Sequence, residues 1–264
     1  MTPIPSLTVM DRPQTRLIGF KGHTKALLGP ALVSYLKARF NLSRKHTYSQ
    51  FGEDAFLVSY FRGKNWNPRS SGSGKLRSTG CYVDIGAYSP TECSNTHIFY
   101  QRGWRGINID ATPESVRAFD LVRKQDINLH CAIGSHEGPV SLYVWDRPSV
   151  FNTLCPEVAR QRERELGRPP EVVSVPCLRL ETVLQRHLPR ATEIDFLNVD
   201  AEGADLDVLR SNNWDRYRPE LVVVEDHVGT FDDLSDSPVR TFFRDQGYEI
   251  HAWIRPSIIY RRTS

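Results

Sequence analysis

The stretch that most constrains the fold of this chain runs from Gly80 to Pro90 and reads GCYVDIGAYSP. Apolar residues surround Asp84, and Gly86 follows two positions later. A short apolar run that ends in Asp-x-Gly is typical of a buried parallel strand, and ligands of open α/β sheets bind beyond the carboxyl ends of such strands. A glycine there lets the backbone approach a ligand closely. The stretch therefore predicts a strand that leads into a binding site, with a plain turn cap as the alternative role of Asp84.

The turn after this strand indicates which nucleotide binds. A dinucleotide needs G-x-G-x-x-G, so that its pyrophosphate can rest on a helix N-terminus. Here Gly86 alone fits that pattern, and a pyrophosphate would gain nothing from the nearby acids Asp84 and Glu92. A ligand with an ammonium and a sulfonium group would be attracted instead, and S-adenosylmethionine is such a ligand.

Length and composition indicate an ordinary globular protein. The 264 residues fit one α/β domain with additions, and the net charge of +3 does not argue for nucleic acid. Five cysteines without C-x-x-C spacing predict neither a zinc site nor a disulfide framework. No apolar segment has the length of a membrane span and no signal-peptide pattern is present, so we expect a cytoplasmic protein.

The basic residues are concentrated at the start of the chain. Residues 1–47 hold eight Lys and Arg against the single acid Asp11, and helical spacing of apolar residues predicts a helix over Pro30–Phe40. We expect this N-terminal extension to pack on the sheet domain at 48–264. The alternatives are pairing with a second subunit in a homodimer, or weak peripheral contact with the anionic inner face of a membrane.

Strand and helix patterns alternate from residue 48 onwards, which predicts a doubly wound α/β sheet. An apolar segment at 55–61 fits a helix or a strand, a Gly/Ser-rich flexible loop is expected at 62–79, and a charged, flap-like insertion at 151–170. Strands are expected at 81–85, 105–110, 126–131, 171–178, 194–200 and 220–225, with an added antiparallel strand at 140–145 and a terminal hairpin at 248–261. Helices are expected at 94–101, 113–122, 180–188, 204–211 and 238–246.

Acidic residues recur at the ends of these predicted strands, as Asp84, Asp110, Asp200 and Glu225. An acid at the end of the second strand normally binds the two hydroxyls of a ribose, which is the role expected of Asp110. Ala132, after the third strand, would border the adenine. A buried strand has no structural need to end on a charge, so four such ends favour a ligand site.

Several motifs in a fixed order resemble the FkbM-type methyltransferases, which are class I S-adenosylmethionine-dependent enzymes. They are SQxGED at 49–54, VDIGAxxP at 83–90, SNT at 94–96, GWxGI at 103–107 and IDFLxxDxEGA at 194–204. The resemblance runs from about Tyr48 to the C-terminus. It implies a doubly wound, mostly parallel, seven-stranded Rossmann-like sheet with helices on both faces. Asn198 departs from the Lys common in this family, and the insertion at 151–170 has no clear counterpart.

The resemblance and the strand ends together give a set of expected cofactor-binding residues. These are Gln50, Glu53, Asp84, Gly86, Ala87, Ser94, Asn95, Thr96, Asp110, Ala132 and Asp200. The resemblance also implies O-methylation, often of a sugar hydroxyl in a glycan, glycolipid or secondary metabolite. The expected partner is thus a small-molecule or glycan acceptor rather than nucleic acid.

A sugar hydroxyl is a poor nucleophile until a base or a metal assists it. His227 is the best candidate base, because an imidazole has an ordinary pKa of about 6.5, with a loop histidine bonded to backbone as the alternative. Asp200, Glu202 and Glu225 are the expected catalytic carboxylates beside it. Mg²⁺ prefers such oxygen ligands, and Asp200, Glu225 and Asp226 are its candidate ligands.

Three other classes of protein remain open. An NAD-dependent oxidoreductase shares the acid of the second strand but lacks support from the glycine pattern. A nucleic-acid methyltransferase would fit the basic extension, but the Asn/Asp-Pro-Pro-aromatic motif of that class is replaced by DAEG at 200–203. A binding module that kept the sheet without catalysis would bind ligand and show no turnover.

Overall fold

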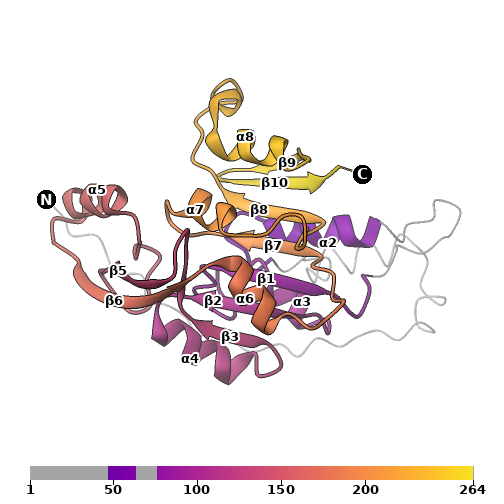
Figure 1. Ribbon diagram of the computed structural model, residues 1–264, viewed down its shortest axis with the longest axis horizontal. Helices are drawn as coiled ribbons and strands as arrows, with labels where there is room; N and C mark the ends of the chain where they lie inside the picture. The colour runs from indigo at the N-terminus through magenta and orange to yellow at the C-terminus, as the bar shows by residue number, and fades with distance from the viewer. Residues whose placement is uncertain (1–46, 64–75, 264) are drawn as a thin grey trace, which may run out of the picture. The chain divides into compact units, whose positions relative to one another are not determined.

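The computed structural model describes residues 47–63 and 76–263 of the chain. The basic extension up to residue 46, with its predicted helix, lies outside the described residues. So do residues 64–75 of the predicted loop, while Arg62 and Gly63 belong to a helix. The remaining residues form a central sheet with helices on both faces (Figure 1).

The central sheet has seven strands and is mostly parallel, as predicted. β1 pairs in parallel with β2 on one side and β7 on the other, and β10 runs antiparallel to both β8 and β9. In spatial order the strands are β3 (Ile127–His130), β2 (Arg105–Asp110), β1 (Cys81–Ile85), β7 (Phe196–Val199), β8 (Leu221–Glu225), β10 (Ser257–Arg262) and β9 (Tyr248–Ile254). The order reverses at β1, which places the carboxyl ends of β1 and β7 at a topological switch point.

The two faces of the sheet are covered by different helices. One face packs aliphatic residues such as Val83 and Val199 against α6 (Leu180–His187), α7 (Asp205–Arg210) and α8 (Pro238–Asp245). The other face holds an aromatic cluster in which Phe61 of α2 (Glu53–Gly63) and Phe99 of α3 (His97–Tyr100) surround Phe196. The apolar segment at 55–61 is therefore helical, and α4 (Pro113–Val122) packs on β2 and β3.

A second, three-stranded sheet stands beside the main one, which the sequence did not predict. Its order is β4 (Ala132–Ile133), β6 (Glu171–Leu178) and β5 (Gly138–Val144), with β6 antiparallel to β5. The predicted strands at 140–145 and 171–178 thus pair with each other rather than extend the main sheet. The predicted strand at 126–131 is β3, from Ile127 to His130, and the chain then leaves the main sheet to form β4.

The predicted insertion at 151–170 contains a helix, α5 (Pro156–Leu166), that lies between β5 and β6 in the chain. We call β5, α5, β6 and their connections the arm; it extends from the main sheet in Figure 1. Gly167 ends α5 in the left-handed conformation that favours glycine, with φ of 67°. Across the described ranges, none of the helices is long and apolar enough to cross a bilayer.

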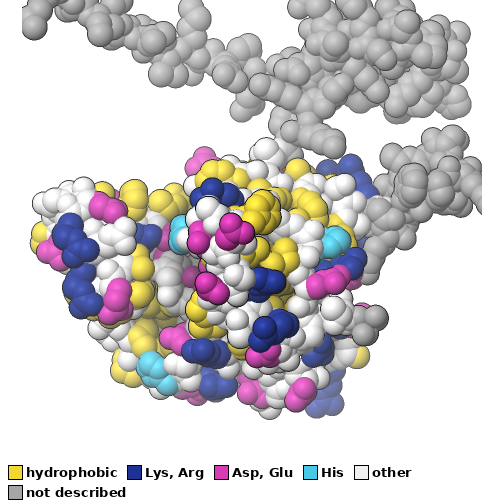
Figure 2. All heavy atoms as spheres, turned by 90° about the horizontal axis from the view of Figure 1, so that it is seen from above, with side chains coloured by type: hydrophobic (Ala, Val, Ile, Leu, Met, Phe, Trp, Pro, Cys, Tyr) yellow, Lys and Arg dark blue, Asp and Glu magenta, His cyan; other side chains and the backbone are white. Residues whose placement is uncertain are grey.

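Charged side chains of both signs are interspersed over the face of the domain seen from above (Figure 2). On that face, the residues that the structure describes form no continuous basic patch.

Candidate active site

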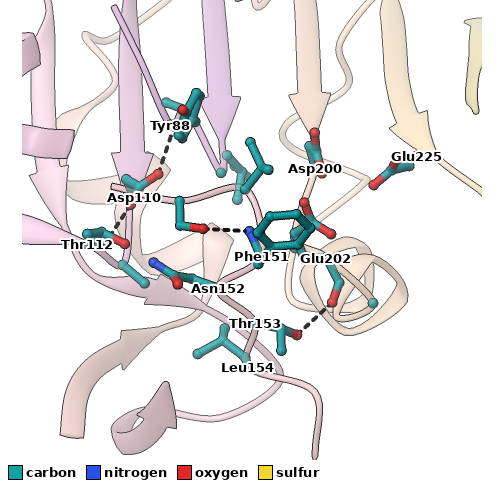
Figure 3. Close-up of a pocket in the computed structure, with 18 of the residues that line it drawn as sticks. Tyr88, Asp110, Thr112, Phe151, Asn152, Thr153, Leu154, Asp200, Glu202 and Glu225 are labelled. Carbon is teal, nitrogen blue, oxygen red and sulfur yellow. Dashed lines mark hydrogen bonds between the residues drawn. The ribbon is translucent and has the colours of Figure 1, made fainter. Parts of the chain in front are cut away.

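A cavity of about 710 Å³ opens at the switch point, between the strand ends and the arm. The ends of β1, β2, β7 and β8 form one wall, and the segment at 149–154 of the arm forms the opposite wall (Figure 3). Asp110 lies at one end of this cavity, and Asp200, Glu202 and Glu225 lie together at the other (Figure 3). The acids that end the predicted strands therefore line one cavity.

The turn after β1 is built around Gly86. Its φ is +73°, and a Cβ added there would lie 1.7 Å from the backbone oxygen of Asp200. The backbone N–H groups of Gly86 and Ala87 both donate to the carbonyl of Ile109, at 3.0 and 3.1 Å. The turn is thus clamped between β2 and β7, and both residues line the cavity.

Asp110, at the end of β2, keeps part of its carboxylate free for a ligand. One oxygen accepts from the backbone N–H of Tyr88 at 2.9 Å, and the other accepts from that of Thr112 at 2.7 Å. Burial raises the pKa of Asp110, and these two hydrogen bonds oppose the rise. The Thr112 side chain also bonds to this carboxylate. Since a carboxylate has about four acceptor positions, capacity for a ligand hydroxyl remains.

Asp84 lines the cavity, but its carboxylate is already hydrogen-bonded within the protein. It is 2% exposed, and its oxygens accept from the Asn198 amide at 2.9 Å and from the Thr96 hydroxyl at 2.6 Å. Burial raises its pKa, while the Thr96 bond and the charge of Arg123 oppose this rise. Asp84 therefore anchors the wall of the site, and Asn95 extends that wall by donating to the Asn198 oxygen at 2.8 Å.

Arg123 supports the wall of the site from the core, and the sequence analysis did not anticipate it. Its side chain is fully buried and donates to the hydroxyls of Thr96 and Ser94, at 2.6 and 2.7 Å, and to the Pro90 carbonyl. Ser94 and Thr96 thus belong to this buried network and are not among the residues that line the cavity. No spacing links Arg123 to the motif at 94–96, so the sequence offered no signal for the contact.

The other expected cofactor residues divide between the cavity and the core. Gln50 and Ala132 line the cavity. Glu53 does not, because it is 2% exposed and accepts hydrogen bonds from the Phe51 backbone and the Ser257 hydroxyl, both at 3.1 Å. Apolar side chains complete the lining beside Ala132, namely Ile133, Leu142, Val150, Phe151 and Leu154.

Three carboxylates converge at the other end of the cavity. Asp200, Glu202 and Glu225 each offer an oxygen, and these oxygens lie within 4.8 Å of one another. Burial raises the pKa of Asp200 well above its ordinary value, and the charges of Glu225 and Glu202 raise it further. One Asp200 oxygen is buried without a hydrogen-bond partner among the described residues. Such an arrangement attracts a proton, a hydroxyl or a cation.

The loop that carries Glu202 is held from both sides. Glu202 has a left-handed backbone with φ of 51°, which is uncommon for a residue other than glycine. The Asp205 carboxylate accepts from the backbone N–H groups of Ala201 and Gly203, at 2.8 and 3.1 Å. Burial raises the pKa of Asp205 to about 6, although these two hydrogen bonds lower it. From the arm, the Thr153 hydroxyl donates to the Glu202 carbonyl at 2.7 Å.

Arg162 of α5 brings the arm into the acidic cluster. It forms an ion pair with Glu202 and donates to the Phe151 carbonyl at 2.8 Å. Burial raises the pKa of Glu202, and Arg162 opposes that rise. A Cβ on Gly203 would lie 2.8 Å from Val158, so α5 packs directly on this loop. In the sequence, only the charged composition of 151–170 hinted at the ion pair between Arg162 and Glu202, and it did not indicate which residue forms it.

His227 and Asp226 both follow β8, but only His227 lies at the cavity. His227 lines the cavity mouth, is 74% exposed, and has Nε2 at 3.4 Å from a Glu225 oxygen. The Asp226 carboxylate instead accepts from the Ser237 hydroxyl at 2.5 Å and does not line the cavity. The three carboxylates that could hold a metal ion are therefore Asp200, Glu202 and Glu225. The predicted metal ligand Asp226 is replaced by Glu202.

Comparisons with known proteins found one matching family model and several solved structures. The model of the methyltransferase FkbM domain matches residues 84–250. A methyltransferase FkbM from Methylobacillus flagellatus is 12% identical with a TM-score of 0.42, over 78% of this chain and 47% of that one, so the match spans about half of its length. A TehB-like SAM-dependent methyltransferase from Corynebacterium glutamicum is 11% identical with a TM-score of 0.34, over 89% and 100%. No curated protein matches the chain.

A further solved structure is the MycE methyltransferase of the mycinamycin biosynthetic pathway, in complex with Mg and SAH. It is 11% identical to this chain with a TM-score of 0.36, over 97% of this chain and 63% of that one.

The strand order is that of a Rossmann-like sheet, and the cavity lies at its switch point, where such sheets bind ligands. The chain belongs to the FkbM family of methyltransferases, whose domain spans well over half of its length. The methyltransferase family that the ordered motifs between 49 and 204 predicted is thereby confirmed.

Proposed function

We propose that the protein is an O-methyltransferase that methylates a hydroxyl group of a sugar. The observation that carries this proposal is that one cavity joins Asp110 to the cluster of Asp200, Glu202, Glu225 and His227. The first end suits a nucleoside, and the second offers several acceptors of hydrogen bonds. A sugar presents several hydroxyl donors, which complement such a cluster.

The residues present fit S-adenosylmethionine. Asp110 has acceptor capacity for ribose hydroxyls, and the Gly86 turn, packed against the Asp200 backbone, lines the cavity beside it. Apolar side chains such as Ile133 and Leu142 suit the adenine ring. The acidic end favours the ammonium and sulfonium charges, since opposite charges attract strongly in a partly buried site.

Transfer requires that the acceptor oxygen lie in line with the methyl group and lose its proton. S-adenosylmethionine supplies the methyl group when bound, and the carbon–sulfur bond breaks as the new carbon–oxygen bond forms. In this proposal His227 accepts the hydroxyl proton, and Glu225, 3.4 Å away, stabilises the resulting imidazolium. Asp200 and Glu202 orient the acceptor by accepting its neighbouring hydroxyl groups.

A divalent cation is a second way to activate the hydroxyl. Asp200, Glu202 and Glu225 would hold Mg²⁺, because their oxygens lie within 4.8 Å of one another and one Asp200 oxygen has no partner among the described residues. Bound there, the cation would lower the pKa of a coordinated hydroxyl.

Turnover on a panel of sugars, followed by release of S-adenosylhomocysteine, tests the proposal. His227→Ala should reduce turnover about 10²–10⁴-fold if the histidine is the base. His136→Ala, at an exposed histidine outside the cavity, is the matched control. If a cation does the activation, EDTA should abolish turnover and Mg²⁺ should restore it. Full activity after both changes would exclude this cluster from the mechanism.

Residues 1–47 carry a second proposal, based on sequence alone. Their eight Lys and Arg against one acid would hold the enzyme weakly at an anionic membrane surface, at about 1 kcal/mol for each basic residue close to it. Flotation with anionic and neutral liposomes, at low and high salt, measures this. Equal flotation with both vesicles at both salt concentrations would favour packing of the extension on protein instead.

A further inference from the structure

A second hollow adjoins the mouth of the cavity. It has a volume of about 250 Å³ and is lined by His227, Val228, Arg255 and Pro256. His227 also lines the main cavity, so the two hollows share a wall. Their position follows from the sheet, because β10 is antiparallel to β8 and its first residue, Ser257, pairs with Glu225 at the carboxyl end of β8. The β9–β10 turn therefore lies at the same edge as the active site.

This turn is fixed and carries a free cation. The Asp226 backbone N–H donates to the Pro256 carbonyl at 3.2 Å, which ties the turn to the end of β8. Arg255 is exposed, and no carboxylate within the described ranges forms an ion pair with it. Its guanidinium lies 5.7 Å from the ring centre of Trp253. Arg255 thus presents positive charge beside a cavity whose nearest end is acidic.

An aromatic surface lies next to Arg255. The rings of Phe231 and Trp253 meet edge to face, with their centres 4.5 Å apart. Phe231 is 76% exposed, the largest exposed fraction among the large apolar side chains in the described part of the chain. Trp253 thus connects the exposed ring of Phe231 to Arg255, and an exposed aromatic ring near an unpaired arginine suits a sugar that carries both apolar C–H groups and an anionic substituent.

From this geometry we infer that the second hollow is a subsite for an anionic sugar unit of the acceptor, adjacent to the unit that is methylated. The ring of that unit rests on Phe231, and its carboxylate or phosphate pairs with Arg255. His227 lies between the subsite and the acids, so it separates the anionic group from the carboxylates that would repel it. This inference rests on the proposed function, because it extends the sugar acceptor beyond the main cavity.

The test uses the ¹⁵N-labelled full chain saturated with S-adenosylhomocysteine and follows the indole N–H signal of Trp253, identified by Trp253→Phe. Glucuronate, glucose 1-phosphate and glucose are titrated as the carboxylate, phosphate and neutral probes. We expect the two anionic sugars to shift the signal with affinities about tenfold higher than that of glucose, as one charge-assisted hydrogen bond would give. The stronger of the two identifies the preferred anion.

Arg255→Ala should remove the difference between anionic and neutral sugars, and Phe231→Ala should weaken all three. The controls are Arg190→Ala, at an exposed arginine before β7 that also has no ion-pair partner within the described ranges, and Leu121→Ala, at an apolar side chain 73% exposed on α4. Both should leave the titrations unchanged. Equal affinities for all three sugars, or an Arg255→Ala protein that keeps the preference, would overturn the subsite.

Failure of the subsite and failure of the proposed function give different results. A protein that methylates a neutral sugar but shows no preference for anionic ones keeps the proposed function and loses the subsite. Failure to methylate any sugar, while S-adenosylhomocysteine still binds, overturns the proposed function together with the acceptor role of the subsite.

Discussion

Gly86 is the position where one added methyl group should both destabilise the protein and weaken cofactor binding. An alanine there must adopt a φ near +73° and place its Cβ 1.7 Å from the Asp200 carbonyl oxygen. The left-handed backbone costs about 1–2 kcal/mol, and forcing β1 and β7 apart adds about 1–3 kcal/mol. Gly86→Ala should therefore lower the free energy of unfolding by about 2–5 kcal/mol.

Gly167→Ala is the matched control for this substitution. Gly167 has a similar φ of +67°, and a Cβ there meets nothing within 4 Å, so only the backbone cost applies. Urea unfolding measures both variants, and titration calorimetry with S-adenosylhomocysteine measures the site. We expect Gly86→Ala to weaken binding at least about tenfold and Gly167→Ala to leave it unchanged. Equal losses of stability, with equal binding, would refute the close approach of the Gly86 turn to β7.

Three further substitutions test the surroundings of the site by urea unfolding. Arg123→Met should destabilise the protein by about 3–5 kcal/mol, because it leaves buried acceptors without their cation, whereas Arg117→Met on the surface of α4 should cost less than about 1 kcal/mol. Arg162→Ala should cost about 1–3 kcal/mol at pH 8 and less at lower pH, because burial raises the pKa of Glu202 and protonation removes the charge that Arg162 pairs with. The raised pKa of Asp200 means that its contribution to stability is present at low pH and lost as the pH rises through that pKa. Asp200→Asn should therefore flatten the fall in stability above about pH 4, and an unchanged pH dependence would contradict the assignment.

The strands of the main sheet could be predicted because each carries its own signal. The apolar run around Asp84 and its glycine turn predict a buried strand without reference to any other part of the chain. The second sheet could not be predicted in this way. The segments at 140–145 and 171–178 read as ordinary strands, and only three-dimensional packing decides that they pair with each other.

In the candidate site too, features set by single strands could be predicted, whereas contacts between residues far apart in the sequence could not. The meeting of Asp110 with Asp200 and Glu225 could be expected, because parallel strands end at one edge of a sheet. Which of Glu202 and Asp226 joins them depends on how the chain turns after each strand. Asp226 is drawn to Ser237, eleven residues further on, and Arg162 reaches Glu202 from the arm. Neither contact leaves a pattern in the sequence.

Calorimetric titration of the wild-type protein and of Asp110→Ala with S-adenosylhomocysteine, and in parallel with NAD, tests the central claim most directly. The claim is that the free acceptor positions of Asp110 bind the ribose of a methyl donor in this cavity. We predict that the wild type binds S-adenosylhomocysteine and not NAD, and that Asp110→Ala weakens this binding by about 1–3 kcal/mol. Tight binding of NAD without binding of S-adenosylhomocysteine, or an Asp110→Ala protein with unchanged affinity, would contradict it.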